Sequence, residues 1–412
     1  MNYLVLMLVA DQLQLDRRVL HEASSLAGQG CYVRIISLCP GMCKPGNLPE
    51  RVIIQDAADL MDSSNISSSL ATRKLVILRL AKKYIPRVIQ EIGYFGIIHP
   101  AQRMARNFGS MEIGKWDVII AHDLPLLPLA FALQNKTGDG KVILDAHELY
   151  DEQKDFLITG TARRYWRSVE DTFLPRCDGV MTVTPRIAEE LKQRHDLGEV
   201  PTVLLNSCPY IKEPKEKGLL YSLYDIPSDK PVVLCQGGLS PGRSLEEFIE
   251  AWEFINKPKP ALVFLGFGRE DYVKSLKTLV KKKSLEKDVF LGKAVAPDEV
   301  LKYTCGASLG LISNRGEGIN NTDGGPNRLF EYIQARIPIL SYEHNGVRQI
   351  LEQTGTGWVI GWESPRQLAE IIMDKLAASN RIERESLNKA AEAFCWENQA
   401  HKLFALLNRV LS

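Results

Sequence analysis

Acidic residues and glycines at the start of one predicted helix have the types and spacing of a ligand-binding loop. Asp323 is followed by Gly324 and Gly325, and Glu331 lies eight positions after Asp323. Pro326 suits the first position of a helix, where its missing N–H costs no hydrogen bond. The free amides at that end of a helix attract phosphate or hydroxyl oxygens. The stretch therefore predicts a loop and helix that hold a phosphorylated or hydroxylated ligand, unless the glycines and acids only serve the helix N-terminus.

A second glycine turn is followed by a cation. Gly237 and Gly238 come directly after a predicted buried strand, and Arg243 stands just before a predicted helix. Ser244 and Glu247 have the spacing of a capping box for that helix. A bare glycine turn with a guanidinium at a helix N-terminus is a diphosphate site in physical terms.

Two histidines follow predicted buried strands. The strand Trp116–Ala121 ends at His122, and the strand Lys141–Ala146 ends at His147. In a doubly wound parallel sheet, ligands bind beyond the carboxyl ends of the strands, so we expect both histidines to face the same opening. A structural role is the alternative for each of them.

The elements that must position these residues belong to an α/β chain. A length of 412 residues favours two domains, and apolar strands alternate with amphipathic helices in both halves. The boundaries are predicted as a first domain over 1–205, a linker over 206–230, a second domain over 231–393 and a terminal helix over 394–412. The dinucleotide fingerprint Gly-x-Gly-x-x-Gly is absent from the first strand-helix-strand unit.

Composition excludes some functions and leaves one surface question open. A net charge of +1 gives no reason to expect nucleic acid, and the eight cysteines lack metal-like pairing, which favours reduced thiols in the cytoplasm. The first apolar run reads as a strand rather than a signal peptide, and no run reaches the length of a membrane span. Residues 70–90 hold basic residues interleaved with apolar ones and no acid before Glu91. Such a helix either lies on an anionic membrane surface or packs on a core with a solvated basic side.

The Asp323 to Glu331 spacing, with the run Pro-Asn-Arg-Leu-Phe-Glu-Tyr, resembles the signature of retaining glycosyltransferases of the GT-B fold, family 4 in particular. The similarity covers nearly the whole chain and is strongest from residue 231 to 360. Three positions depart from the usual pattern: Asp323 stands where Glu is usual, Arg243 where Lys is usual, and Gly238 where Arg is more common.

The resemblance implies two Rossmann-like domains that face a central cleft, with the terminal helix crossing back to the first domain. It implies transfer of a sugar, with retention, from a nucleoside-diphosphate sugar to a hydroxyl group of a glycan or lipid-linked acceptor. A UDP-sugar is the expected donor and a GDP-sugar the alternative. The setting would be bacterial cell-surface polysaccharide or glycolipid biosynthesis, in the cytoplasm or on the inner face of the membrane.

The resemblance also assigns residues, and without an Asp-x-Asp motif it implies no metal ligand. The catalytic set is His122, Arg243 and Asp323. The donor-binding set is Gly237, Gly238, Arg243, Gly266, Lys293, Ala294, Gly324, Gly325, Asn327, Arg328 and Glu331. The acceptor side holds Asp16 and His147.

Two other functions fit the same sequence. A GT-B epimerase would share the nucleotide half and would isomerise its donor without an acceptor. A non-catalytic protein that binds nucleotide sugars is the second, and the departures at Asp323 and Gly238 favour it.

Overall fold

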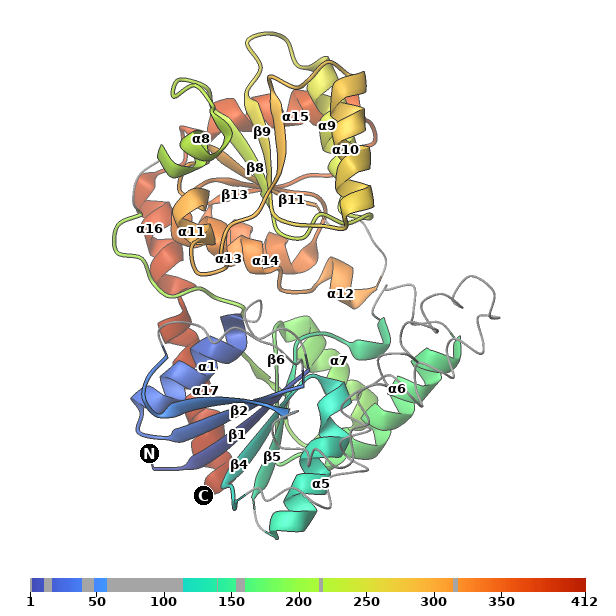
Figure 1. Ribbon diagram of the computed structural model, residues 1–412, viewed down its shortest axis with the longest axis vertical. Coiled ribbons are helices and arrows are strands. Elements are labelled where there is room, and N and C mark those ends of the chain that lie inside the picture. The colour runs from blue at the N-terminus through green and yellow to red at the C-terminus, as the bar shows by residue number, and fades with distance from the viewer. Residues whose placement is uncertain are drawn as a thin grey trace. The chain divides into compact units, whose positions relative to one another are not determined.

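The computed structural model describes residues 2–10, 17–38, 48–57, 114–138, 140–152, 160–214, 218–313 and 318–412 (Figure 1). Two compact units divide the chain. The first is Met1–Leu204 together with Ala400–Ser412, and the second is Leu205–Gln399. The expected acceptor-side residue Asp16 and the basic segment 70–90 lie outside the described residues. Within the described residues, no helix is both long and apolar enough to cross a membrane.

The first unit is built on a parallel sheet, whose described strands follow the order β3-β2-β1-β4-β5-β6-β7. Its strands are β1 (Leu4–Val9), β2 (Tyr32–Ser37), β3 (Val52–Asp56), β4 (Val118–His122), β5 (Lys141–Ala146), β6 (Gly179–Thr182) and β7 (Thr202–Val203). The central strands are apolar almost throughout because helices cover both of their faces.

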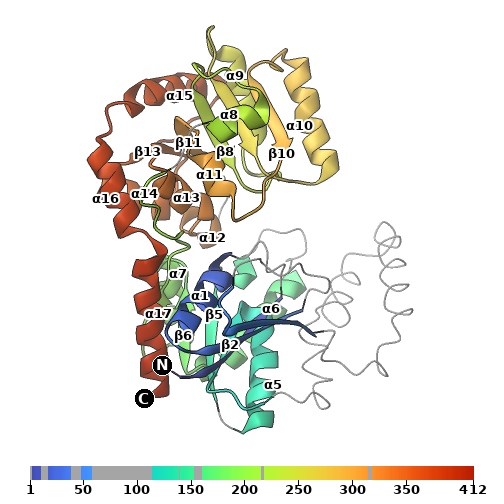
Figure 2. The same ribbon diagram turned by 60° about the vertical axis from the view of Figure 1, so that its left-hand side comes forward.

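Helices α1 and α17 pack on one face of this sheet, against the side chains of alternate strand residues. Helix α5 lies on the opposite face (Figures 1 and 2). The helices of the first unit are α1 (Arg17–Gly28), η4 (Leu124–Leu126), α5 (Leu127–Thr137), η5 (Tyr150–Glu152), α6 (Gly160–Phe173), η6 (Leu174–Arg176), α7 (Pro185–His195) and, from Ala400 onward, α17 (Trp396–Leu411).

The second unit repeats the plan with a parallel sheet in the order β10-β9-β8-β11-β12-β13. Its strands are β8 (Val232–Gln236), β9 (Ala261–Leu265), β10 (Val289–Lys293), β11 (Leu309–Ile312), β12 (Ile339–Ser341) and β13 (Gly357–Val359). Parallel sheets with helical layers in both units confirm the predicted α/β class.

Alternation along the strands separates two cores. Val233 and Cys235 of β8 face the layer of α9, α10 and α15, whereas Val232 and Leu234 face the layer of α8, α13, α14 and α16. The helices are α8 (Gly218–Tyr224), α9 (Leu245–Phe254), α10 (Glu270–Lys282), α11 (Val300–Thr304), α12 (Ile319–Thr322), α13 (Asn327–Ala335), α14 (Asn345–Thr354), α15 (Pro365–Ser379) and α16 (Arg384–Ala393).

The segment 206–230, expected to be a linker, is part of the second unit. It contains α8, and Cys208, Leu220, Tyr224 and Ile226 are buried in the core on the α13 side of the sheet. The prediction of an interdomain linker was wrong. The segment is rich in Pro, Lys and Tyr and has no clear periodicity, but a few apolar residues bury it in the core.

Candidate functional site

Two arginines from different elements lie against the glycine turn that follows β8. Gly237 has a φ of 112°, a conformation that favours glycine. A Cβ atom at this position would lie 3.4 Å from Arg243 Nη1 and 3.9 Å from Arg328 Nη1. The structure thus brings Arg243 and Arg328 to the same turn, although Arg328 is 91 positions from Gly237 in the sequence.

Arg243 holds a positive charge that no other described residue neutralises. It makes no hydrogen bond or ion pair within the part of the chain that the structure describes. Burial, and then the charge of Arg328, lower the pKa of Arg243 to about 10, so it stays protonated at neutral pH. A guanidinium that is half-buried beside a second one is suited to an anionic group such as a diphosphate.

The capping box predicted at Ser244 and Glu247 does not form. Ser244 has a φ of 55° and its side chain makes no capping bond, whereas a capping serine needs extended backbone. Glu247 instead accepts a hydrogen bond of 3.0 Å from Trp362 Nε1. The turn from Gly237 to Arg243 therefore leads into α9 without a side-chain cap.

Glu331 lies on α13, as predicted, and is almost completely buried, with 4% of its surface exposed. Its carboxylate accepts a hydrogen bond from Gln236 Nε2. Pro326 was expected at the first helical position, but it is the residue before the helix, with φ of −66° and ψ of 124°. Asn327 takes the first position and is exposed.

The loop before α13 depends on its glycines. A side chain at Gly324 would clash with the backbone oxygen of Asn320. The carbonyl oxygen of Gly325 accepts a hydrogen bond of 2.9 Å from Asn206 Nδ2. Asp323 is half-buried and accepts hydrogen bonds from Thr322 Oγ1 at 2.6 Å and from Asn345 Nδ2 at 3.3 Å.

His344 is a buried residue beside this loop that sequence reasoning missed. Its Nδ1 atom caps α14 by accepting the N–H of Val347 at 3.2 Å, which places the imidazole proton on Nε2. Burial lowers the pKa of His344 to about 4, and the charge of Arg328 adds to that effect while Asp323 opposes it. The N-cap is a local signal that could have identified the capping role, but not the influence of the Asp323 charge.

A cavity of about 400 Å³ opens beyond β9 and β10 in the second unit. It is lined by Gly266, Phe267, Gly268, Glu270, Val273, Lys274, Lys277, Gly292 and Ala294. The predicted residues Gly266 and Ala294 are among the lining residues. The Lys293 side chain turns to α8, where Nζ donates to the Leu223 carbonyl oxygen and lies 5.3 Å from the centre of the Tyr224 ring.

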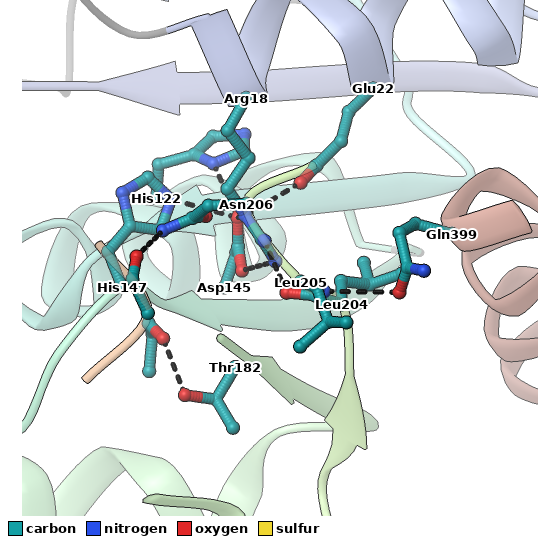
Figure 3. A network of polar contacts seen from close by, with 12 residues as sticks. Arg18, Glu22, His122, Asp145, His147, Thr182, Leu204, Leu205, Asn206 and Gln399 are labelled. Atoms are coloured by element: carbon teal, nitrogen blue, oxygen red, sulfur yellow. Dashed lines mark hydrogen bonds and ion pairs between the residues drawn. The ribbon is translucent and has the colours of Figure 1, made fainter. Parts of the chain in front are cut away.

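In the first unit, His122 and His147 lie close together, as the strand order predicts. Their ring centres are 5.6 Å apart, and both rings bond to Asp145, through His122 Nδ1 at 3.1 Å and His147 Nε2 at 2.9 Å (Figure 3). His122 and Asp145 are register partners on adjacent parallel strands. Their side chains therefore leave the sheet on the same face.

Arg18 of α1 completes this cluster. Its guanidinium donates to both carboxylate oxygens of Asp145, at 2.8 and 2.7 Å, and to the Leu204 carbonyl oxygen at 2.6 Å. Glu22, one turn further along α1, lies 3.0 Å from Arg18 Nε. Burial, then the charge of Asp145, raise the pKa of Glu22 well above its ordinary value. Of the two carboxyl groups, Glu22 is therefore the one that keeps its proton to higher pH.

Asp145 is the ionised member. Burial alone would raise its pKa, but Arg18, His147 and the hydrogen bonds from both histidines hold that pKa well below its ordinary value. The ligand atoms of His122, Asp145 and His147 lie within 4.8 Å of one another, a spacing that a metal ion could use. The guanidinium of Arg18 already occupies both oxygens of Asp145, so the cluster fits an ion-paired carboxylate that orients two histidines better than it fits a cation site.

The sequence matches two families in tandem. Residues 15–206 match Glycosyltransferase Family 4, and residues 223–394 match Glycosyl transferases group 1. The chain is a family 4-like member of the GT-B glycosyltransferases. This GT-B glycosyltransferase chain therefore carries its two arginines and Glu331 in the group 1 half, and His122 with Asp145 in the family 4 half.

Two curated relatives are distant from this GT-B glycosyltransferase in sequence. The amylovoran biosynthesis glycosyltransferase AmsK of Erwinia amylovora is 24% identical over 141 residues, which are 34% of this chain and 35% of the relative. Spore coat protein SA of Bacillus subtilis is 28% identical over 194 residues, 44% of this chain and 49% of the relative. The chain thus spans between a third and a half of the length of these curated relatives.

Solved structures resemble the chain over its full length. HepE of Anabaena in complex with UDP-glucose has a TM-score of 0.66 at 14% identity, covering 99% of this chain and 100% of that one. At this identity the similarity supports the GT-B fold alone.

Proposed function

We propose that this chain transfers a glycosyl group from a nucleoside-diphosphate sugar to a hydroxyl group, with retention at the anomeric carbon. The observation that carries the proposal is the pair of guanidinium groups at the Gly237 turn, where Arg243 has no counter-charge among the described residues. A diphosphate leaving group supplies that counter-charge. The family and the UDP-glucose complex of the structural neighbour HepE support a sugar nucleotide, with a UDP-sugar first and a GDP-sugar second.

Each residue has a chemical role in this proposal. Arg243, aided by Arg328 and by helix amides, stabilises the negative charge that builds on the diphosphate as the sugar leaves. Glu331 accepts hydrogen bonds from the ribose hydroxyl groups. Asp323 contacts the sugar ring. The role of His122 in holding the sugar stays a prediction from the resemblance. Such charge stabilisation lowers the barrier only if it is stronger in the transition state than in the ground state.

The acceptor is proposed to be a glycan or lipid-linked hydroxyl in bacterial surface polysaccharide or glycolipid synthesis. The name of the relative AmsK, an amylovoran biosynthesis glycosyltransferase, supports that setting. Contact with an anionic membrane stays a prediction from residues 70–90, and salt-sensitive sedimentation with anionic vesicles, but not neutral ones, would support it.

The substitution Glu331→Gln tests the donor site. Hydrogen bonds to a charged acceptor contribute about 1.5–3 kcal/mol, so we expect the dissociation constant for the bound nucleotide to rise roughly 10- to 150-fold. Calorimetric titration with UDP, UDP-glucose, GDP and GDP-mannose measures this. Glu170→Gln is the matched control, because Glu170 is equally buried in the first unit and bonds to His195 there.

Two outcomes would contradict the proposal. The first is a parent protein that binds none of the four nucleotides. The second is a Glu331→Gln variant that binds as tightly as the parent while Glu170→Gln also leaves binding unchanged.

A further inference from the structure

Gln236, the last residue of β8, points its side chain at α13 rather than at solvent. Val232 and Leu234 belong to the core on the α13 side of the sheet, and the period of two along a strand places Gln236 on the same face. Only 2% of its surface is exposed. A buried glutamine at a strand end needs partners for four hydrogen-bonding groups.

Three of these groups bond to α13. The side-chain Nε2 donates to the Glu331 carboxylate. The backbone N–H donates to the Tyr332 hydroxyl oxygen at 3.2 Å, and the backbone oxygen accepts from Arg328 Nη1 at 3.4 Å. One residue thus holds the arginine at the glycine turn and the buried glutamate of α13.

The fourth group fixes which way the side-chain amide faces. Thr304, at the end of α11, is completely buried. Its hydroxyl lies 2.8 Å from Gln236 Oε1 and 2.9 Å from the Val300 carbonyl oxygen, and these two acceptors share its one proton. The amide nitrogen donates to Glu331 and the amide oxygen accepts from Thr304, which is the orientation that suits an acceptor-only carboxylate. Thr304, Gln236 and Glu331 therefore form a directed chain from α11 through β8 to α13.

We propose that Gln236, with its amide oriented by Thr304, is the positioning residue that holds the Glu331 carboxylate ready for the ribose of the donor. The inference rests on the proposed function, because it assigns the support of a binding group rather than a separate activity. A carboxylate that is fixed before the ligand arrives loses less conformational freedom on binding, which strengthens binding without a new ligand contact.

Matched variants separate this role from a contribution to folding. Gln236→Met keeps the shape of the side chain and removes the donor. Thr304→Val removes the hydroxyl group, and Thr304→Ser returns it. Gln334→Met is the control. Gln334 is a buried glutamine of α13, the helix that carries Glu331, but it bonds to Ala391 and Ile211 instead.

The readouts are the dissociation constants for UDP and for GDP, the KM and kcat for hydrolysis of UDP-glucose, and the melting temperature of each variant. We expect Gln236→Met to weaken nucleotide binding about tenfold, as for other groups that orient a binding side chain. Thr304→Val should weaken it less, and Thr304→Ser should restore what Thr304→Val loses. KM should rise while kcat changes little, and Gln334→Met should lower the melting temperature only.

The double variant Gln236→Met with Glu331→Gln decides whether Gln236 acts through Glu331. If it does, Gln236→Met has little further effect on affinity once Glu331 is changed. Full additivity of the two losses would overturn the inference, as would parent-like affinity of Gln236→Met in a protein where Glu331→Gln binds weakly. A parent that binds neither UDP nor GDP would overturn the proposed function, and the inference with it.

Discussion

The two units each hold a cluster of charged residues at the end of a sheet, and the two clusters are balanced differently. In the first unit, Asp145 accepts hydrogen bonds from two nitrogens of the Arg18 guanidinium and is bonded to two histidine rings. The pKa of the neighbouring Glu22 is raised. In the second unit, Arg243 and Arg328 lie against one glycine turn, and Arg243 has no partner among the described residues.

The difference in charge balance indicates that the two clusters have different roles. A buried carboxylate with its counter-charge in place stabilises the arrangement around it, and here that arrangement includes the ring of His122. Burial lowers the pKa of Arg243, and repulsion from Arg328 lowers it further, so the proximity of the two cations stabilises the fold little or not at all. We infer that the first cluster is selected for positioning and the second for an anion that arrives from outside. Substitutions in the two clusters should therefore separate stability from activity.

The largest expected effect is on stability, from Asp145→Asn. The variant removes the ionised carboxylate that pairs with the buried Arg18, and removing one partner of a buried ion pair costs about 3–5 kcal/mol. Glu22, 3.0 Å from Arg18 Nε, offsets part of this loss if it ionises in the variant. Thermal unfolding of the apo protein measures this as a lowered melting temperature of the first unit. A melting temperature equal to that of the parent would show that the first cluster does not hold its unit together.

Glu22→Gln is the matched control at the same cluster. The neutral amide replaces the carboxyl group whose pKa is raised, so we expect a much smaller loss. Because the pKa of Glu22 is raised in the folded state, the parent should lose stability as the pH rises above 4.5, the ordinary pKa of glutamate. Glu22→Gln should remove that pH dependence. Loss as large as in Asp145→Asn would contradict the assignment of the proton to Glu22.

The next largest effect is on turnover, from Arg243→Ala. Removing one preorganised donor to a developing charge typically costs about 100- to 1000-fold in turnover. We expect the melting temperature to stay near that of the parent, since the removed charge lies beside another cation. Arg243→Lys should recover part of the rate, because it restores the charge without the planar fork.

Initial rates at saturating donor measure this prediction, with hydrolysis of UDP-glucose as the assay until an acceptor is found. Near-normal turnover of Arg243→Ala would remove the arginine from the reaction. Loss of the parent's activity on chelation, with recovery on adding a divalent cation, would contradict stabilisation of the leaving group by side chains and amides alone.

The residues that sequence reasoning found share one property: their signal is local. Gly237 and Arg243 stand within one turn and helix start, and Asp323 and Glu331 within one loop and helix, so spacing alone relates them. The strand ends at His122 and His147 were also readable, because parallel strands place their carboxyl ends at one edge.

The residues that it missed are related only through space. Gln236 reaches Glu331 across 95 positions, and Arg18 reaches Asp145 across 127. Alternation along β5 does place Asp145 on the face that α1 covers, but it does not say which helix residue will meet it. Ser244 was misread for a related reason, since a capping pattern cannot report the left-handed backbone that prevents the cap.

The smallest expected effect concerns His344. This buried residue of the second unit is neutral, in contrast to Arg243 of the same unit, which is charged. Its Nδ1 atom caps α14, so His344→Ala should lose about 1 kcal/mol at neutral pH, whereas His344→Asn, which keeps a capping acceptor, should lose less. Thermal melting of both variants, with and without UDP, separates the cap from any effect on the nucleotide.

The pH dependence of that stability follows from the lowered pKa of His344. In the unfolded chain the imidazole titrates near 6.5, whereas burial lowers the pKa of His344 to about 4 in the folded protein. Below 6.5 the unfolded state therefore binds a proton that the folded state refuses, so stability present above pH 6.5 is lost as pH falls toward 4, by at most about 1.4 kcal/mol per pH unit. His344→Asn lacks the titrating group and should melt with a shallower pH dependence across this window, even though it is no more stable at pH 7. If the melting temperatures of the parent and of His344→Asn changed with pH in the same way, the imidazole would not be held neutral in the fold. The contrast between a neutral His344 and a charged Arg243 would then be wrong.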